Sequence, residues 1–366
     1  MGRVQVRRYI GPAVRLYHQA LREELSVNYN RSKGLSLVEL MVALVLSLVI
    51  GAAVMQMFLS SKTTYRVQDA MSRLQENGRF AVGLIAEESR MAGYMGCGNI
   101  DEIGINVIAS PPPLDATNPL GEIMGGADNV ASGNVWGATV GTDVLTIRKA
   151  SNLGLQLTGN MAVDNANIQV LDNRLGLEAG DTLFIADCVS ADIFRATSVS
   201  AAGGKTTVAH ANNLNTSNRL SKAYGVDAEV MAFEQIDFFI RDTARLSSDG
   251  TPVRALWMQR RFANRSDTSA NPAELVDGVE DFQVEYGIKT ANSPVANEYR
   301  SADDVTDWSR VVSVRFRLLL SSTDDNVTAK AGDAVQSINF NGTAIAADGR
   351  LRQTFGSVVA VRNRVR

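Results

Sequence analysis

The stretch that decides the fold is residues 33–59, which read KGLSLVELMVALVLSLVIGAAVMQMFL. Its last twenty residues, Leu40–Leu59, carry no formal charge. At a rise of 1.5 Å per residue, a helix of that length spans about 30 Å, the thickness of the hydrocarbon core of a bilayer. The sequence therefore predicts one transmembrane helix over residues 40–59.

The charges on either side of this run indicate its orientation. Residues 1–34 contain seven Lys and Arg against two Glu, whereas the rest of the chain contains 29 basic and 37 acidic residues. A positive flank stays in the cytoplasm, so we expect the N-terminus inside and the body of the protein outside the membrane. The acidic balance of that body argues against a broad basic face for nucleic acid, a partner that the sequence does not support.

Glu39 lies at the edge of the apolar run, where a carboxylate is costly and therefore indicates a function. The residues before it are a basic leader, Gly34 and the apolar Leu35, and Glu39 is the fifth residue after the glycine. This pattern resembles the signature of the type IV pilin and pseudopilin family. The resemblance implies that a membrane-embedded prepilin peptidase removes the leader, residues 1–34, and methylates the new amine of Leu35. Cleavage would create an ammonium about 6 Å along the helix from Glu39, and the two charges could neutralise each other in a filament.

Two other interpretations compete with this one. A secretory signal peptide would be cut after the apolar run, where Gly51-Ala52-Ala53 offers small residues, and a plain signal anchor would not be cut at all. Neither has a use for Glu39. The run also departs from the family pattern, because Leu35 replaces the usual phenylalanine and the run contains no proline. Whether the helix melts near Gly51 therefore stays open.

Beyond the membrane run, apolar residues recur at three- and four-residue steps and predict that the helix continues as an amphipathic stem. The stripe consists of Val67, Met71, Leu74, Gly78, Ala81, Val82, Ile85 and Ala92. Gly93, Gly96 and Gly98 supply a stop, so we expect a stem over residues 35–98.

Residues 99–366 alternate short apolar runs with turn residues, which is typical of a β-rich head. The expected strands are residues 143–148, 182–187, 193–198, 228–233, 255–260, 281–286, 311–320 and 357–361. We therefore predict an α+β, type IV pilin-like fold in which a long N-terminal helix, half membrane-spanning and half amphipathic, packs on an antiparallel β-rich head. The size of the head leaves room for an inserted subdomain.

The sequence contains few residues of the types that commonly catalyse reactions or bind metals. The only histidines are His18 and His210 and the only cysteines are Cys97 and Cys188, without metal-binding spacing. We expect no enzyme activity, no metal and no cofactor. In an exported head the two cysteines predict one disulfide, with two buried free thiols as the alternative.

Further segments sharpen the resemblance toward the PilW-type minor pilins: residues 74–80, 90–94, 96–97, 312–320 and 361–364. The resemblance implies a low-abundance subunit that primes pilus assembly at the filament tip, in adhesion, twitching motility or DNA uptake. Its implied partners are the prepilin peptidase, other minor pilins, the major pilin, a large tip adhesin and the inner-membrane pilus assembly machinery.

Two rival functions remain. The large minor pseudopilin of a type II secretion system shares the leader, the stem and the β head. A membrane-anchored enzyme or binding protein is a rival from another class, although the chain has no GxSxG motif. Weaker signals are a basic end, Arg362, Arg364 and Arg366, for phosphate contacts, and Asp324-Asp325-Asn326 as oxygen ligands for calcium.

Overall fold

The computed structural model describes residues 34–98, 103–113, 119–262, 272–290, 293, 295–325, 327–328, 338–345 and 348–364. The chain divides into two compact units, residues 1–62 and 63–366. It combines one long helix with mainly antiparallel sheets, which confirms the predicted α+β class. The exception is the parallel pair of β1 (Gly104–Val107) and β7 (Ser190–Arg195).

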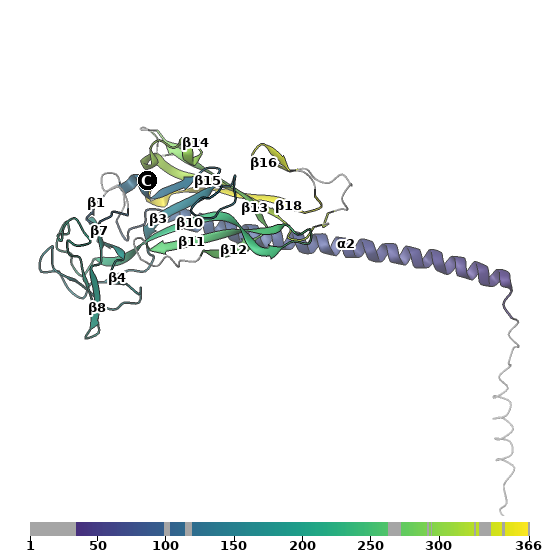
Figure 1. Cartoon of the computed structure of the whole chain (residues 1–366), viewed down its shortest axis with the longest axis horizontal. Coiled ribbons are helices and arrows are strands. Elements are labelled where there is room, and N and C mark those ends of the chain that lie inside the picture. The colour runs from purple at the N-terminus through teal and green to yellow at the C-terminus, as the bar shows by residue number, and fades with distance from the viewer. Residues whose placement is uncertain are drawn as a thin grey trace, which may run out of the picture. The chain divides into compact units, whose positions relative to one another are not determined.

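The helix, α2, runs from Leu37 to Arg90 (Figure 1). Within the described residues it is the one helix long and apolar enough to cross a membrane. The side chains of its apolar run, from Leu40 to Leu59, are exposed. The helix ends three residues before Gly93, the first of the predicted stop glycines, whose φ is 69°. The N–H of Gly93 donates to the carbonyl of Arg148, so the chain has turned toward a strand there.

Residues 63–90 of α2 pack against the head. The buried positions follow one stripe that includes Leu74, Gly78, Ala81 and Ile85, as the amphipathic pattern predicts. Gly78 permits the closest approach, since a Cβ there would lie 2.6 Å from ring atoms of Phe355. The absence of a side chain at Gly78 therefore lets the helix approach Phe355 closely.

One sheet of the head has the order β14-β13-β15-β18, with antiparallel pairs throughout. Its strands are β13 (Val279–Lys289), β14 (Ala296–Arg300), β15 (Val311–Ser321) and β18 (Arg352–Ala360). The alternation of Val312–Leu318, which predicted this sheet, places Val314, Phe316 and Leu318 in the core.

Nine strands of the described residues form a second sheet around β10, which spans Glu229–Leu246. The first part of β10 pairs with β4 and β6, and the later part with β3 and β11. The other strands are β1 (Gly104–Val107), β2 (Met124–Ala127), β3 (Val144–Ala150), β4 (Leu155–Gln156), β6 (Thr182–Ala186), β7 (Ser190–Arg195), β11 (Pro252–Phe262) and β12 (Ala273–Asp277).

Smaller elements complete the head. Three strands pair as β5-β9-β8, and β16 pairs with β17. Their bounds are β5 (Ile168–Val170), β8 (Ser198–Ala202), β9 (Lys205–Ala209), β16 (Ile338–Phe340) and β17 (Thr343–Ile345), and the 3-10 helices are η1 (Pro119–Glu122), η2 (Ala302–Asp304), η3 (Trp308–Arg310) and η4 (Arg362–Arg364).

The head contains two main apolar cores. The larger joins the stem helix to both sheets, through residues such as Ile85, Ile147 and Phe316. The second is built from Ile108 and residues 155–232, around Phe194 and Tyr224. Each of the eight predicted strands has an observed counterpart, although β7 begins three residues before the predicted Ile193 and Ser198 already belongs to β8.

A charged cluster fastens the end of the stem to the larger sheet. Glu88, on the last turn of α2, lies 2.7 Å from the ammonium of Lys149 and 2.6 Å from the guanidinium of Arg260. Arg260 also pairs with Glu234 at 2.5 Å. The side chain of Lys149 is fully buried, and Glu88 provides the counter-charge for its ammonium.

Asp143 joins the two large sheets. Its N–H donates to the carbonyl of Phe282, and its carboxylate accepts from the N–H groups of Asn129 and Val284. Burial raises the pKa of the Asp143 carboxyl to about 7, with a further contribution from Asp128. A protonated carboxyl is therefore favoured more in the folded chain than in the unfolded chain.

The Glu88 cluster predicts a large loss of stability for Glu88→Gln. The substitution leaves the buried Lys149 ammonium without its counter-charge, which costs about 3–5 kcal/mol of unfolding free energy. Chemical unfolding of the full chain in detergent measures this cost. Glu87→Gln is the control, because Glu87 is the exposed neighbour on the same helix. Equal stabilities of the two variants would contradict the importance of the cluster.

The Asp143 site predicts a pH dependence. Because folding raises the pKa of Asp143, this residue contributes most to the free energy of unfolding below its unfolded pKa of about 4. That contribution falls by about 4 kcal/mol as the pH rises to about 7. Asp143→Asn should remove this fall in the free energy of unfolding when unfolding is measured between pH 4 and 7. The exposed Asp172→Asn serves as control, and an unchanged slope in Asp143→Asn would disprove the assignment.

Candidate assembly site at the start of the helix

The three residues that matched the leader motif lie together at the start of α2. Gly34 and Leu35 precede the helix, Glu39 lies in its first turn, and all three are exposed. A Cβ on Gly34 would meet no atom within 4 Å. The peptide bond between Gly34 and Leu35 is therefore open to an enzyme.

Ser36 and Glu39 cap the helix reciprocally. The N–H of Glu39 donates to the Ser36 hydroxyl at 3.1 Å, and the N–H of Ser36 donates to the Glu39 carboxylate at 3.3 Å. This is a capping box, and the Ser-x-x-Glu spacing of residues 36–39 is its local signal in the sequence. The carboxylate also faces the positive end of the helix dipole.

Cutting the chain before Leu35 would change the partners available to Glu39. The new ammonium would lie about one helical turn from a carboxylate that now accepts from an N–H and a hydroxyl. A full positive charge is a stronger partner than either donor. The geometry therefore suits a carboxylate that is held by its own chain before cleavage and is available to an ammonium afterwards.

The predicted disulfide is present in the head. Cys97 and Cys188 are bonded, with their Cα atoms 5.0 Å apart and 91 positions apart in the sequence. The bond ties the segment that follows α2 to the turn between β6 and β7. Chain-entropy estimates for a loop of this length allow up to about 4.6 kcal/mol of stabilisation.

The basic C-terminal end does not form the predicted three-arginine surface. Arg364 is buried, and its guanidinium donates to the carbonyls of Trp308 and Val311, the latter at 2.9 Å. Those carbonyls belong to the first residue of η3 and the first residue of β15. The hydrogen bonds that they accept offset the cost of burying the guanidinium. Arg362 is exposed, and Arg366 lies outside the described residues.

The sequence offered Asp324, Asp325 and Asn326 as oxygen ligands for calcium. Asp325 accepts a hydrogen bond from the Ser248 hydroxyl, and Asn326 lies outside the described residues. The buried His210 places its Nε2 3.0 Å from the Ala166 carbonyl oxygen. In the described part of the chain, His, Cys, Asp and Glu do not gather in a group of three that could hold a metal ion.

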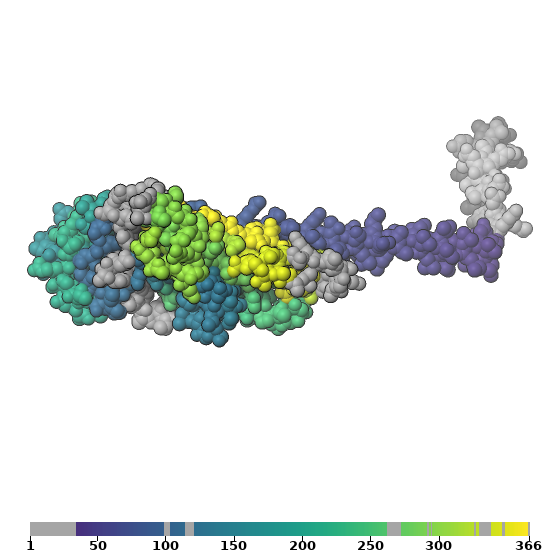
Figure 2. All heavy atoms as spheres, turned by 90° about the horizontal axis from the view of Figure 1, so that it is seen from above, coloured from purple at the N-terminus to yellow at the C-terminus, as the bar shows by residue number. Residues whose placement is uncertain are grey.

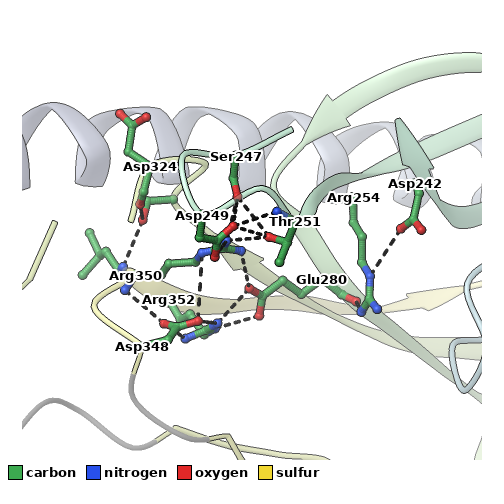
Figure 3. A network of polar contacts seen from close by, with 12 residues as sticks. Asp242, Ser247, Asp249, Thr251, Arg254, Glu280, Asp324, Asp348, Arg350 and Arg352 are labelled. Carbon is green, nitrogen blue, oxygen red and sulfur yellow. Dashed lines mark hydrogen bonds and ion pairs between the residues drawn. The ribbon is translucent and has the colours of Figure 1, made fainter. Parts of the chain in front are cut away.

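A polar network links the turn between β10 and β11 to the segment before β18 (Figure 3). Arg350 donates to Asp249, Ser247 and Thr251 at 2.7–3.0 Å, and Arg352 pairs with Glu280 and Asp348. Hydrogen bonds from Ser247 and Thr251, together with the Arg350 charge, hold the pKa of Asp249 well below its usual range.

A hollow of about 340 Å³ lies beside this network and is lined by Asp242, Arg254, Glu280 and Arg350 among others. Its charged groups already have partners, since Arg254 lies 3.5 Å from Asp242 and donates to the Glu280 carbonyl. The network therefore holds the fold together rather than presenting an unpaired charge to a ligand.

Comparison with known families adds two matches. Residues 29–55 match the prokaryotic N-terminal methylation motif, which covers Gly34, Leu35 and Glu39. Residues 237–363 match the type IV pilus-assembly protein W family. This match begins within β10 and ends within η4. Neither match covers residues 56–236. No curated protein and no solved structure matches the chain.

Proposed function

We propose that this chain, a type IV pilin-like protein of the PilW type, is a minor pilin that is stored in the inner membrane and helps to prime pilus assembly. One observation carries the proposal: a methylation motif at the start of an apolar helix occurs in the same chain as a W-type pilus-assembly domain. The first feature supports processing and storage in the membrane. The second supports a role in building a pilus.

The first step is processing at the membrane. Prepilin peptidase cuts between Gly34 and Leu35 on the cytoplasmic side and methylates the Leu35 amine. The open surroundings of Gly34 and the basic residues before it support this step. The helix then remains in the bilayer with its N-terminus inside and its head in the periplasm.

The second step is extraction into a filament. There the exposed apolar surface from Leu40 to Leu59 would leave lipid and pack against the helices of other subunits. Glu39 would exchange its Ser36 partners for the ammonium of its own or a neighbouring Leu35. Because an unpaired charge in such surroundings costs several kcal/mol, this pair would select the correct axial position of the subunit.

The head would act by contact rather than by catalysis. Its buried clusters around Glu88 and its disulfide fasten the head to the stem, which supports a structural role. We place the subunit at or near the filament tip, with other minor pilins and beneath a large adhesin, in adhesion, twitching motility or DNA uptake. Recovery with a secretin-linked machine instead of pili would favour the pseudopilin of type II secretion.

The mature N-terminus tests the processing step. In cells with prepilin peptidase we expect N-methylated Leu35 by mass spectrometry, and in cells without it the leader should remain. Gly34→Leu should block the cut because its side chain fills the open space at the scissile bond. An intact leader in normal cells, or a start near Val54, would contradict the proposal.

Glu39→Gln tests the assembly step. The variant should be cut and methylated, but its recovery in sheared pili should fall at least roughly tenfold, because the ammonium loses its partner. Glu76→Gln is the matched control, since Glu76 is an exposed glutamate farther along the same helix. Normal incorporation of Glu39→Gln would show that the carboxylate does not guide packing.

A further inference from the structure

The last strand of the head, β18, forms one edge of its sheet (Figure 1). Nine of its residues pair with β15 in an unbroken register, from Arg352 opposite Ser321 to Ala360 opposite Ser313. Among the residues that the structure describes, no strand pairs with its other side. Figure 2 shows the C-terminal residues, in yellow, at the surface of the molecule.

Two hydrogen bonds beyond the ends of β18 fix which backbone groups face outward. The N–H of Val361 donates to the Val312 carbonyl at 2.9 Å, and the N–H of Ser322 donates to the Leu351 carbonyl at 2.8 Å. In an antiparallel pair, hydrogen-bonded and non-hydrogen-bonded positions alternate, so the odd-numbered residues of β18 face β15. The N–H and C=O groups of Thr354, Gly356, Val358 and Ala360 therefore point away from the sheet.

This edge lacks the features that natural proteins use to prevent pairing, such as short length, charges, proline or a bulge. From Gln353 to Ala360 it has no charge, no proline and no register shift. The opposite edge, β14, has five residues, a register shift and the charged Glu298 and Arg300. The sequence of β18 is thus suited to accept another strand.

The surface beside this edge is also accessible. Thr354, Gly356, Val358 and Ala360 are exposed, and three of them are small. At the end of the strand Arg362 is exposed, whereas Arg352 at the start is neutralised by Glu280 and Asp348. A strand that pairs here would meet an uncharged centre and a cation at one end only.

We propose that the outer edge of β18 accepts an extended strand from another pilin-type subunit, a partner that rests on the proposed function. The partner segment is uncharged opposite Thr354–Val358 and carries an acidic residue beside Arg362. A second copy of β18 fits less well, because Glu280 and Asp348 at its start are already bound to Arg352 and leave no free carboxylate for Arg362. Main-chain hydrogen bonds supply the affinity, and Arg362 sets the direction.

Val358→Pro tests the edge without removing a bond to β15. Proline lacks the N–H that points outward at position 358, and proline is tolerated in edge strands when that N–H faces solvent. Val358→Thr is the matched control, because threonine keeps the N–H and the β-branched shape. Thr354→Pro repeats the test at the other half of the strand.

The measurement is photo-crosslinking in living cells. A photoreactive side chain at Ala360 of the full-length chain captures its neighbour, which mass spectrometry identifies. We expect an adduct with another pilin-type subunit in Val358→Thr and a loss of at least roughly tenfold in both proline variants, since a buried carbonyl of the partner loses its donor. Formation of the Cys97–Cys188 bond and normal abundance verify folding of each variant.

Equal adducts in the proline and threonine variants would overturn the proposal, as would an adduct formed only with a second copy, only with an unrelated protein, or no adduct at all. Failure of the proposed function is recognised separately. It would appear as normal piliation in cells that lack this chain, whereas a proline-sensitive adduct with a pilin-type subunit would still uphold the edge.

Discussion

The structure depends on the burial of one stripe of α2 against two sheets. Leu74, Gly78, Ala81 and Ile85 lie on this stripe, and the larger core closes only when helix and sheets are together. Gly78 lets the helix approach β18 closely, and Glu88 at the end of the stripe binds cations from β3 and β11. Removal of this helix half would expose the shared core of both sheets and deprive the Lys149 ammonium of its counter-charge, Glu88.

The elements that could be predicted from the sequence are those with a local or compositional signal. The uncharged run from Leu40 to Leu59 and the stripe of the stem follow from simple periodicity. The alternation in β15 gave its inner face directly, because side chains along a strand alternate between the two faces of a sheet. The bond between Cys97 and Cys188 had no competing pairing, since the chain has two cysteines.

The features that escaped prediction depend on residues far apart in the sequence. Glu88 looks like any solvated helix residue until Lys149 and Arg260 are placed beside it. Arg364 looks like part of a solvated tail, yet carbonyls more than fifty positions earlier draw it inside. The helix ends at Arg90, three residues before the predicted stop at Gly93, and sequence alone did not show that the N–H of Gly93 donates to the Arg148 carbonyl of β3. The Ser36 cap differs, since its signal was local and could have been used.

The position of β18 connects the packing of the stem with the proposed pairing to another subunit. One face of the strand contacts the stem through Phe355 and Gly78, and its inner edge is bonded to β15 along its whole length. The outer edge is therefore held in one geometry before any partner arrives. A preformed edge loses little conformational entropy on binding, so even a short partner strand could bind with useful affinity. In such a complex the strand that binds the partner would itself pack on the stem, because Phe355 belongs to β18.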